Sequence, residues 1–234
     1  MNASRQGSPR ILLTGFGPFP GVAVNVSAEL AKAAQRIIAA HRPDASIIAE
    51  ALPTEWVRGL TRIDELWARH QPSAALHLGV SANATGFVIE RAAYNACSPN
   101  PDACGQLPGD DLHGAGQPPM RKTTLALDTL DSLTKTLTGE NIACSISDDP
   151  GRYLCNAIYY RSLGHAGVCG APVLFLHIPA SLVAGAVPAR QASSNRKINW
   201  DTATRGTELA LTALIAHAAE PPRTLRLNRS KQKL

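Results

Sequence analysis

Cys155 combines a reactive side chain with a position that can activate it. It lies in the sequence PGRYLCN at residues 150–156, after an apolar run and at the start of a predicted helix. The first turn of a helix presents free N–H groups and the positive end of the helix dipole, which favour a thiolate over a thiol. The same N–H groups can receive a developing oxyanion. Many buried cysteines only pack as small apolar side chains, but this position makes Cys155 a candidate nucleophile.

His177 and Glu90 are the corresponding candidates for a base and an acid. His177 ends the apolar run at residues 173–176, and the functional groups of parallel sheets gather at the carboxyl ends of strands. Glu90 ends a similar run at residues 87–89, where a carboxylate is costly unless it is paired. The neighbouring Arg91 points to the opposite face of a strand, which leaves Glu90 free for another partner. A hydrogen-bonded core histidine and an ion pair with Arg91 are the alternatives. With Cys155, the two residues form a triad hypothesis for a cysteine hydrolase.

Alternating strands and helices are needed to position these residues. Apolar runs predict strands at residues 11–14, 46–52, 74–78, 86–92, 143–147 and 173–178. Apolar residues at helical spacing predict helices at residues 27–41, 55–70, 125–137, 154–163 and 201–219, the first of them capped by Asn25 or Ser27. This order of elements indicates a single-domain, three-layer α/β/α fold with a mainly parallel, twisted central sheet.

The chain of 234 residues is expected to form one α/β domain over residues 1–220, followed by a basic, flexible tail at residues 221–234. Much of the excess positive charge lies in that tail, and aromatic residues make up only 5% of the chain without alternating with basic ones, so we expect no nucleic-acid partner. No apolar run approaches the roughly 18 residues that cross a bilayer, and no apolar signal segment follows residues 1–10. We therefore expect no membrane partner and a cytoplasmic protein.

The five cysteines form no pattern typical of a metal site or a disulfide framework. Their number is odd, no CxxC pair occurs and HExxH is absent, so we expect free thiols in a reducing compartment, no metal and no other cofactor. Cys97 and Cys104 flank a Pro-rich stretch and would be the pair to form if the chain were oxidised. Residues 97–119 are rich in Pro, Gly, Asp and Asn and are predicted to form a long surface loop, a type that is often functional.

The first predicted strand runs into the loop GFGPFPG at residues 15–21. This loop lacks the third glycine of the dinucleotide-binding pattern GxGxxG, and the chain contains neither a GxSxG elbow nor a GxxxxGK[ST] phosphate loop. A rigid loop that carries two phenylalanines at the end of a strand is more typical of a pocket wall.

At these residues the sequence resembles the pyroglutamyl peptidase I family of cysteine peptidases, also called pyrrolidone carboxyl peptidases. Four segments are similar to motifs of that family and stand in the family's order: TGFGPF at 14–19 with Asn25, IERA at 89–92 with Asn95, GRYLCN at 151–156 and HIP at 177–179. The resemblance extends from about Arg10 to Ala219.

The resemblance implies an activity and a set of site residues. Members of the family remove an N-terminal pyroglutamyl residue from peptides through a thioester, so the substrate would be a peptide or amide that begins with pyroglutamate. The implied catalytic residues are Glu90, Cys155 and His177. The implied substrate-binding residues are Phe16 and Phe19, which would enclose the lactam ring, with Val80, Tyr153 and Leu154 beside them. The oligomeric state stays open, with a homodimer or a homotetramer as the forms considered.

Departures from the family pattern keep other functions open. Gly17 stands where the family usually carries Glu, and the segment after Gly79 is unusual. The loop that reads roughly DARIPDNxG in the family is NACSPNPD at residues 95–102, and no arginine occurs between Arg91 and Arg121. One alternative is a related cysteine hydrolase of a different small acyl or lactam substrate. The other is a non-catalytic member that binds a peptide end, against which the intact candidate triad argues.

Overall fold

The computed structural model describes residues 8–110, 112–185 and 198–219, in which strands and helices alternate. The strands are β1 (Arg10–Phe16), β2 (Ser46–Leu52), β3 (Ala74–Ser81), β4 (Phe87–Glu90), β5 (Ala92–Tyr94), β6 (Met120–Lys122), β7 (Cys144–Ser147) and β8 (Val173–Pro179). The helices are α1 (Val26–His41), α2 (Trp56–His70), α3 (Leu127–Gly139), α4 (Leu154–Cys169) and α5 (Trp200–Ala219). The tail predicted at residues 221–234 lies outside the described residues.

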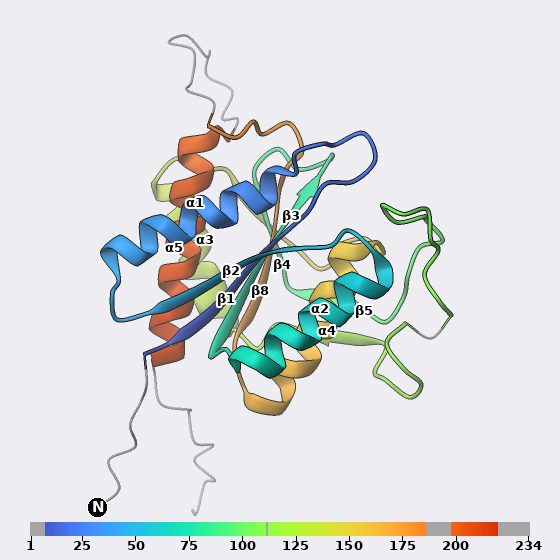
Figure 1. Ribbon diagram of the computed structural model, residues 1–234. Coiled ribbons are helices and arrows are strands. Elements are labelled where there is room, and N and C mark those ends of the chain that lie inside the picture. Colours follow the sequence, from blue (N-terminus) through green and yellow to red (C-terminus); the bar gives the residue numbers. More distant parts are fainter. Residues whose placement is uncertain (1–7, 111, 186–197, 220–234) are drawn as a thin grey trace, which may run out of the picture.

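Six strands form the central sheet, in the order β2-β1-β3-β8-β4-β7 (Figure 1). The strands β2, β1, β3 and β8 run parallel to one another. Strand β4 pairs antiparallel with β8 and parallel with β7. The predicted mainly parallel sheet is therefore confirmed, with β4 and β7 running against the other four strands.

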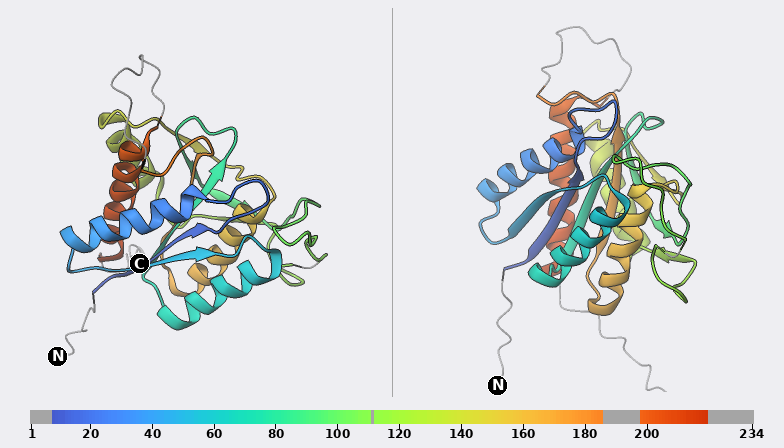
Figure 2. Two further views of the ribbon diagram at one scale, coloured as in Figure 1. Left: turned by 45° about the horizontal axis from the view of Figure 1, so that its top comes forward. Right: turned by 45° about the vertical axis from the view of Figure 1, so that its right-hand side comes forward.

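Helices cover both faces of this sheet, as the right-hand view of Figure 2 shows. One apolar cluster joins α1, α3 and α5 to the side chains on one face, among them Leu76 and Leu176. A second cluster joins α2 and α4 to the opposite face, among them Ala75 and Phe175. Neighbouring residues on one strand belong to different clusters because side chains alternate between the faces of a sheet. The predicted three-layer arrangement is confirmed.

Helices begin and end at residues that supply the caps. Asn25 precedes α1, and its side-chain oxygen accepts a hydrogen bond from Ser27 N–H at 3.2 Å, as one of the two predicted caps. Helix α4 ends at Gly170, which has a left-handed φ of 75° that glycine adopts without a Cβ clash. Among the described helices, none is long and apolar enough to cross a membrane.

The strand predicted at residues 86–92 is divided in the structure. Strand β4 belongs to the central sheet, whereas β5 pairs with β6 in a separate two-stranded sheet. The change of partner occurs at Arg91, whose N–H donates to Ser147 O while its carbonyl accepts from Thr123 N–H. Between β5 and β6, the described residues of 95–119 form neither helix nor strand, so the predicted long loop is confirmed.

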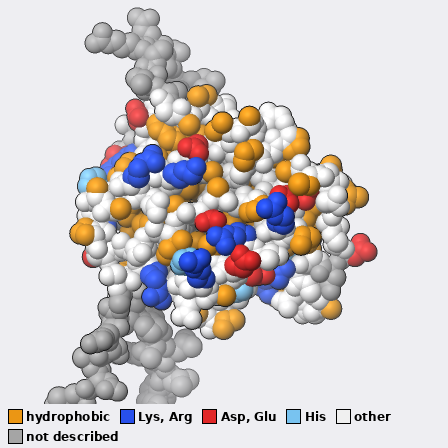
Figure 3. All heavy atoms as spheres, viewed as in Figure 1, with side chains coloured by type: hydrophobic (Ala, Val, Ile, Leu, Met, Phe, Trp, Pro, Cys, Tyr) orange, Lys and Arg blue, Asp and Glu red, His pale blue; other side chains and the backbone are white. Residues whose placement is uncertain are grey.

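The surface seen in Figure 3 carries basic and acidic side chains beside one another. On helix α2, Arg58 pairs with Glu55, and Arg62 pairs with both Glu50 and Glu65 at 2.9 Å. Exposed pairs of this kind contribute only about 0–1 kcal/mol each to the free energy of unfolding. Their main consequence is that the positive charge of α2 is balanced locally.

Candidate active site

Cys155 occupies the first turn of α4. Tyr153 is the residue before the helix, so Cys155 is the second helical residue, and its side chain is half-buried. No side chain caps this end and no acidic residue lies in the first turn, so the free N–H groups and the positive dipole end act on the sulfur without a competing charge. The tight turn that leads into the helix uses Gly151, whose φ of 79° strongly favours glycine. The predicted location of Cys155 is confirmed.

His177 and Glu90 come from adjacent strands and contact each other. His177 Nδ1 lies 2.8 Å from Glu90 Oε1, and both side chains are almost fully buried. Arg91 does not compete for the carboxylate, because its guanidinium pairs with Asp148. The sequence-based argument that Glu90 is free for a partner other than Arg91 therefore holds in the structure.

The direction of β4 corrects one part of the sequence reasoning. Glu90 was expected to reach the site at the carboxyl end of a strand that runs parallel to its neighbours, but β4 runs antiparallel to β8. Val88 pairs with His177 and Glu90 pairs with Phe175, so all four side chains point to the α4 face of the sheet. Because β4 is only four residues long, Glu90 at its carboxyl end pairs with Phe175, which is two residues before His177 on β8.

The charge state of His177 follows from its two neighbours. Burial lowers the pKa of the imidazole, but the hydrogen bonds and negative charges of Cys155 and Glu90 outweigh burial and raise it to about 10. With Nδ1 on Glu90, the remaining ring nitrogen Nε2 is the one available to the Cys155 sulfur. At neutral pH the His177 ring is therefore protonated and lies between the Glu90 carboxyl group and the Cys155 side chain, an arrangement suited to activating a cysteine nucleophile.

Most of the expected substrate-binding residues lie in the same cluster as Cys155. Phe16 and Leu154 are buried in the α2–α4 cluster, and Tyr153 and Cys155 pack against it. The Tyr153 ring stands edge-on to Trp56 with centroids 5.1 Å apart, and its hydroxyl donates to Pro101 O at 2.9 Å. The structure thus brings an aromatic wall next to the candidate nucleophile.

Phe19 and Val80 are not part of that cluster. Phe19 is half-buried on the loop after β1, where its backbone pairs with Val22. The Val80 side chain packs against the α1–α5 cluster, on the opposite face of the sheet from Cys155. The reason is the alternation along β3, in which Gly79 points toward the Cys155 side and Val80 away from it. Only the backbone of Val80 can therefore face a ligand on the Cys155 side.

The loop after β5 is fastened to the start of α2 by Asp102. Its buried carboxylate accepts hydrogen bonds from the backbone N–H groups of Trp56, Cys104 and Gln106 at 2.8–2.9 Å. Burial of the carboxylate opposes ionisation, but these three N–H groups hold the pKa of Asp102 below its usual value. Asp102 therefore shapes the loop, and the Pro101 carbonyl that accepts from the Tyr153 hydroxyl holds Tyr153 in place.

Asn156 is a buried polar residue of the site to which the sequence analysis gave no role. Its side chain accepts from Tyr94 N–H at 2.7 Å and donates to the carbonyls of Tyr94 and Ala96 at 2.8 and 3.0 Å. It thereby joins the first turn of α4 to the segment that follows Glu90. The signal in the sequence was an amide directly after Cys155, which would otherwise face a costly burial.

His77 is a second histidine on the same face of the sheet as His177, and its position excludes the role of base. The ring is fully buried, with Nδ1 at 2.7 Å from Thr14 Oγ1 and Nε2 at 2.7 Å from Ser162 Oγ. Burial lowers its pKa to about 3, so the ring stays neutral and joins β1 and β3 to α4.

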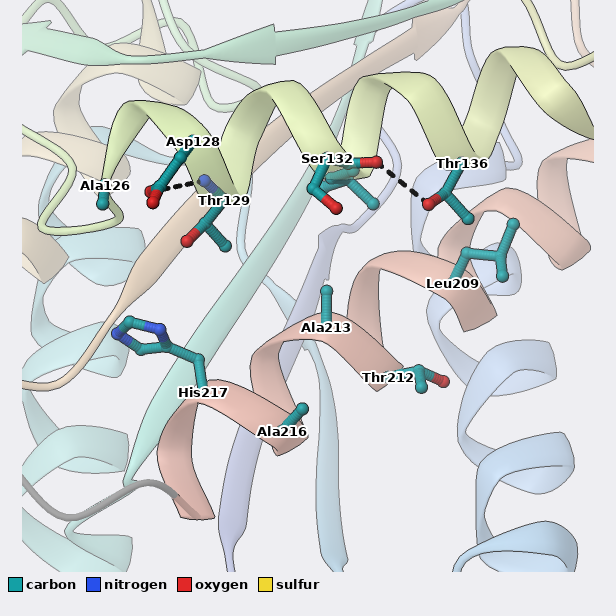
Figure 4. Close-up of a pocket in the computed structure, with 11 residues that line it drawn as sticks. Ala126, Asp128, Thr129, Ser132, Thr136, Leu209, Thr212, Ala213, Ala216 and His217 are labelled. Atoms are coloured by element: carbon teal, nitrogen blue, oxygen red, sulfur yellow. Dashed lines mark hydrogen bonds between the residues drawn. The ribbon is translucent and has the colours of Figure 1, made fainter.

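A hollow of about 460 Å³ lies between α3 and α5, on the face of the sheet away from Cys155 (Figure 4). Hydroxyl and methyl groups line most of it, from Thr129, Ser132, Thr136, Ala213 and Ala216. Asp128 and His217 lie at one end without contacting each other in Figure 4. Its lining contains no thiol, so the hollow does not compete with Cys155 as a site of acyl transfer.

Comparisons with known proteins agree with this geometry. Residues 9–217 match the family model described as pyroglutamyl peptidase. The chain is 30% identical to pyroglutamyl-peptidase 1 of Rattus norvegicus over 72% of its length and 78% of the relative's, and 32% identical to the pyrrolidone-carboxylate peptidase of Gloeobacter violaceus over 88% and 96%. It is similar to the crystal structure of Bacillus amyloliquefaciens pyroglutamyl peptidase I, with a TM-score of 0.74, 25% identity and coverage of 91% of this chain and 100% of that one.

Proposed function

Because the chain belongs to the pyroglutamyl peptidase family, we propose that it removes an N-terminal pyroglutamyl residue from peptides through a thioester on Cys155. The observation that carries the proposal is the His177 ring, held at 2.8 Å by Glu90 and raised in pKa to about 10 by Glu90 and Cys155 together. In the proposal His177 is the proton donor and Cys155 the nucleophile, the pair that amide cleavage by a cysteine requires.

In the first step the Cys155 thiolate attacks the carbonyl carbon of the pyroglutamyl residue. The electron pair of the carbonyl moves onto oxygen, and the free N–H groups of the first turn of α4 stabilise the resulting oxyanion. His177 then gives its proton to the amide nitrogen as the C–N bond breaks, so the peptide leaves as a neutral amine. Glu90 holds the ring in the orientation that this transfer needs.

In the second step water hydrolyses the thioester. His177, now neutral, takes a proton from the water as its oxygen attacks the thioester carbonyl. Collapse of this intermediate breaks the C–S bond, releases pyroglutamic acid and restores the thiolate beside the imidazolium. The two steps use the same ring nitrogen, first as an acid and then as a base.

The lactam ring is recognised by apolar surface in this proposal. Phe19 and Phe16 enclose the ring, with Tyr153 and Leu154 of the α2–α4 cluster beside it. Such a pocket favours an uncharged cyclic residue over open-chain glutamate or glutamine, because an unpaired charged α-amine in apolar surroundings costs several kcal/mol. Phe16 is only 3% exposed, so it contributes mainly by supporting the wall, and the half-buried Phe19 makes the more direct contact.

Phe19→Ala is expected to raise KM for a pyroglutamyl amide roughly fivefold, because loss of an aromatic contact removes about 1 kcal/mol of binding. The value of kcat should change less, since ring stacking exists in the ground state and the transition state alike. Steady-state kinetics measure both. Val24→Ala is the matched control, because Val24 is 64% exposed and stands on the same loop. Equal KM values for Phe19→Ala and Val24→Ala would remove Phe19 from the pocket.

The function itself is tested by comparing two amides that differ only in the acyl residue. The proposal expects release of the chromogenic amine from a pyroglutamyl amide, little release from the glutaminyl amide, and loss of both after treatment with a thiol reagent. Thiol-sensitive turnover of another small acyl or lactam amide, without turnover of the pyroglutamyl amide, would favour the second hydrolase considered. That alternative draws support from the segment between Arg91 and Arg121, which contains no arginine. The arginine nearest in sequence to Cys155 is Arg152, and its guanidinium carbon lies 4.0 Å from the centroid of the Tyr94 ring.

The location and assembly of the protein are part of the proposal. We place it in the cytoplasm, a reducing compartment, because all five cysteines are free thiols, including the exposed Cys104 and Cys169.

All three proposed catalytic side chains come from one chain, so each subunit of a homodimer or homotetramer would carry a complete site. Sedimentation of the purified protein measures which form exists.

A further inference from the structure

Gly79 lies directly beside the candidate triad. It is on β3, paired in register with His177 on β8. It belongs to the alternation that points toward α4, so a side chain at this position would point toward Cys155. Glycine therefore leaves room at a strand position that lies beside the nucleophile.

That space is filled by the nucleophile and by an aromatic ring. A Cβ built on Gly79 would lie 2.9 Å from Cys155 Sγ, and 2.8 Å from Cζ and 3.0 Å from Cε1 of Phe175. These separations are well below the roughly 3.5 Å of an ordinary non-bonded contact. The sulfur and the ring edge therefore rest against the bare backbone of β3.

The Phe175 ring has little freedom to give way. It is fully buried, with its centroid 4.9 Å from the His177 ring and 5.6 Å from the Tyr159 ring. The Cys155 sulfur is held by a single rotatable bond on a half-buried side chain. A methyl group at position 79 would thus displace the sulfur at lower cost than the ring.

We propose that Gly79 is a positioning residue for the reaction, because its missing side chain lets the Cys155 sulfur rest against β3 within reach of His177. The edge of the Phe175 ring lies beside the same position, and this ring also packs against the imidazole of His177. The inference rests on the proposed role of Cys155 as nucleophile. The charged and titratable groups that face His177 are Glu90 from β4 and Cys155 from α4, and the substitution alters neither.

The test is Gly79→Ala, read out by kcat/KM and by alkylation of Cys155 with iodoacetamide at pH 6, quantified on the peptide that carries Cys155. A misplaced nucleophile typically costs on the order of 100-fold in rate, and we expect losses of that size in both measurements with an unchanged circular-dichroism spectrum. Gly167→Ala is the matched control, because Gly167 lies on the helix that carries Cys155 and a Cβ there meets nothing within 4 Å. Alkylation needs no pyroglutamyl substrate, so it tests Gly79 even if the protein proves to act on another amide.

The double variant Gly79→Ala/Phe175→Leu separates positioning from general strain. Leucine removes the ring atoms that a Cβ at position 79 would meet, so the strand can shift and the sulfur can return. We expect part of the lost alkylation rate at pH 6 to be recovered. An unchanged alkylation rate in folded Gly79→Ala, or no recovery in a folded double variant, would overturn the proposal. If Gly79→Ala does not fold, the double variant is compared with Phe175→Leu alone: the proposal expects slower alkylation of Cys155 in the double variant, and an equal rate would overturn it.

Discussion

Cys155→Ala is expected to lower kcat/KM for a pyroglutamyl amide by at least about 10,000-fold, because the remaining site can polarise the carbonyl but cannot form a covalent intermediate. The fold should be unaffected. Cys155 is half-buried at the start of α4, and alanine favours a helix more than cysteine does. The thermal midpoint and the circular-dichroism spectrum check the fold, and the release of amine checks the activity.

Cys144→Ala is the matched control for that result. Cys144 is also half-buried, and burial raises the pKa of its thiol to about 11, so it is an inert thiol at neutral pH. Its replacement should leave kcat/KM within a factor of about two, since structural cysteines act only through packing. Activity retained in Cys155→Ala, in protein prepared free of contaminating peptidase, would contradict the assignment of the nucleophile.

His177→Ala is expected to reduce kcat/KM by at least about 1,000-fold, because the site loses both its proton donor and its base. Glu90→Gln should cost less, on the order of 100-fold, since it removes one fixed electrostatic partner and leaves the imidazole in place. An amide at position 90 can still accept from His177 Nδ1 across the 2.8 Å contact, but it no longer stabilises the imidazolium. Steady-state kinetics on the pyroglutamyl amide measure both losses.

The pH dependence distinguishes these two variants. The pKa of His177 is raised to about 10, so the ring is protonated below that pH, and kcat/KM of the wild type should fall only as the pH rises through about 10. Removing the charge of Glu90 lowers the pKa of His177, so the alkaline limb of Glu90→Gln should lie at lower pH. In His177→Ala the imidazole is absent, so an alkaline limb near pH 10 should be absent too. Alkaline limbs at the same pH in wild type and Glu90→Gln would contradict the role of Glu90.

The elements with clear periodicity were predictable to within a few residues. The strand at 46–52 has the predicted bounds, and the last helix begins one residue earlier than the predicted 201–219. Helix α4 extends to Cys169 rather than ending at Leu163, because burial of Ala166 carries the helix past two glycines that interrupt the apolar pattern. Strand β6 was not predicted, because it has only three residues and follows two prolines, so it is too short to show an alternating apolar pattern.

The candidate residues of the site could be chosen from the sequence, but their geometry could not. Cys155, His177 and Glu90 each stand where a buried element meets a loop, and that placement is visible in the sequence. Strand direction is not encoded in a pattern of alternating residues, so the antiparallel pairing that brings Glu90 to His177 could not be foreseen. Which face of β3 packs against α4 was not visible in the sequence either, so the direction of Val80, away from the other candidate binding residues, was not predicted.

The most direct test of the account is to trap the acyl group on the enzyme. A pyroglutamyl aryl ester has a good leaving group, so acylation becomes fast and hydrolysis of the thioester limits turnover. Acid quenching within the first turnover, followed by mass spectrometry of the peptide that carries Cys155, shows where the acyl group resides. The account predicts a burst of phenol equal to the enzyme concentration and a pyroglutamyl group on Cys155. Turnover of the ester with no burst, or with the acyl group on any other residue, would contradict it.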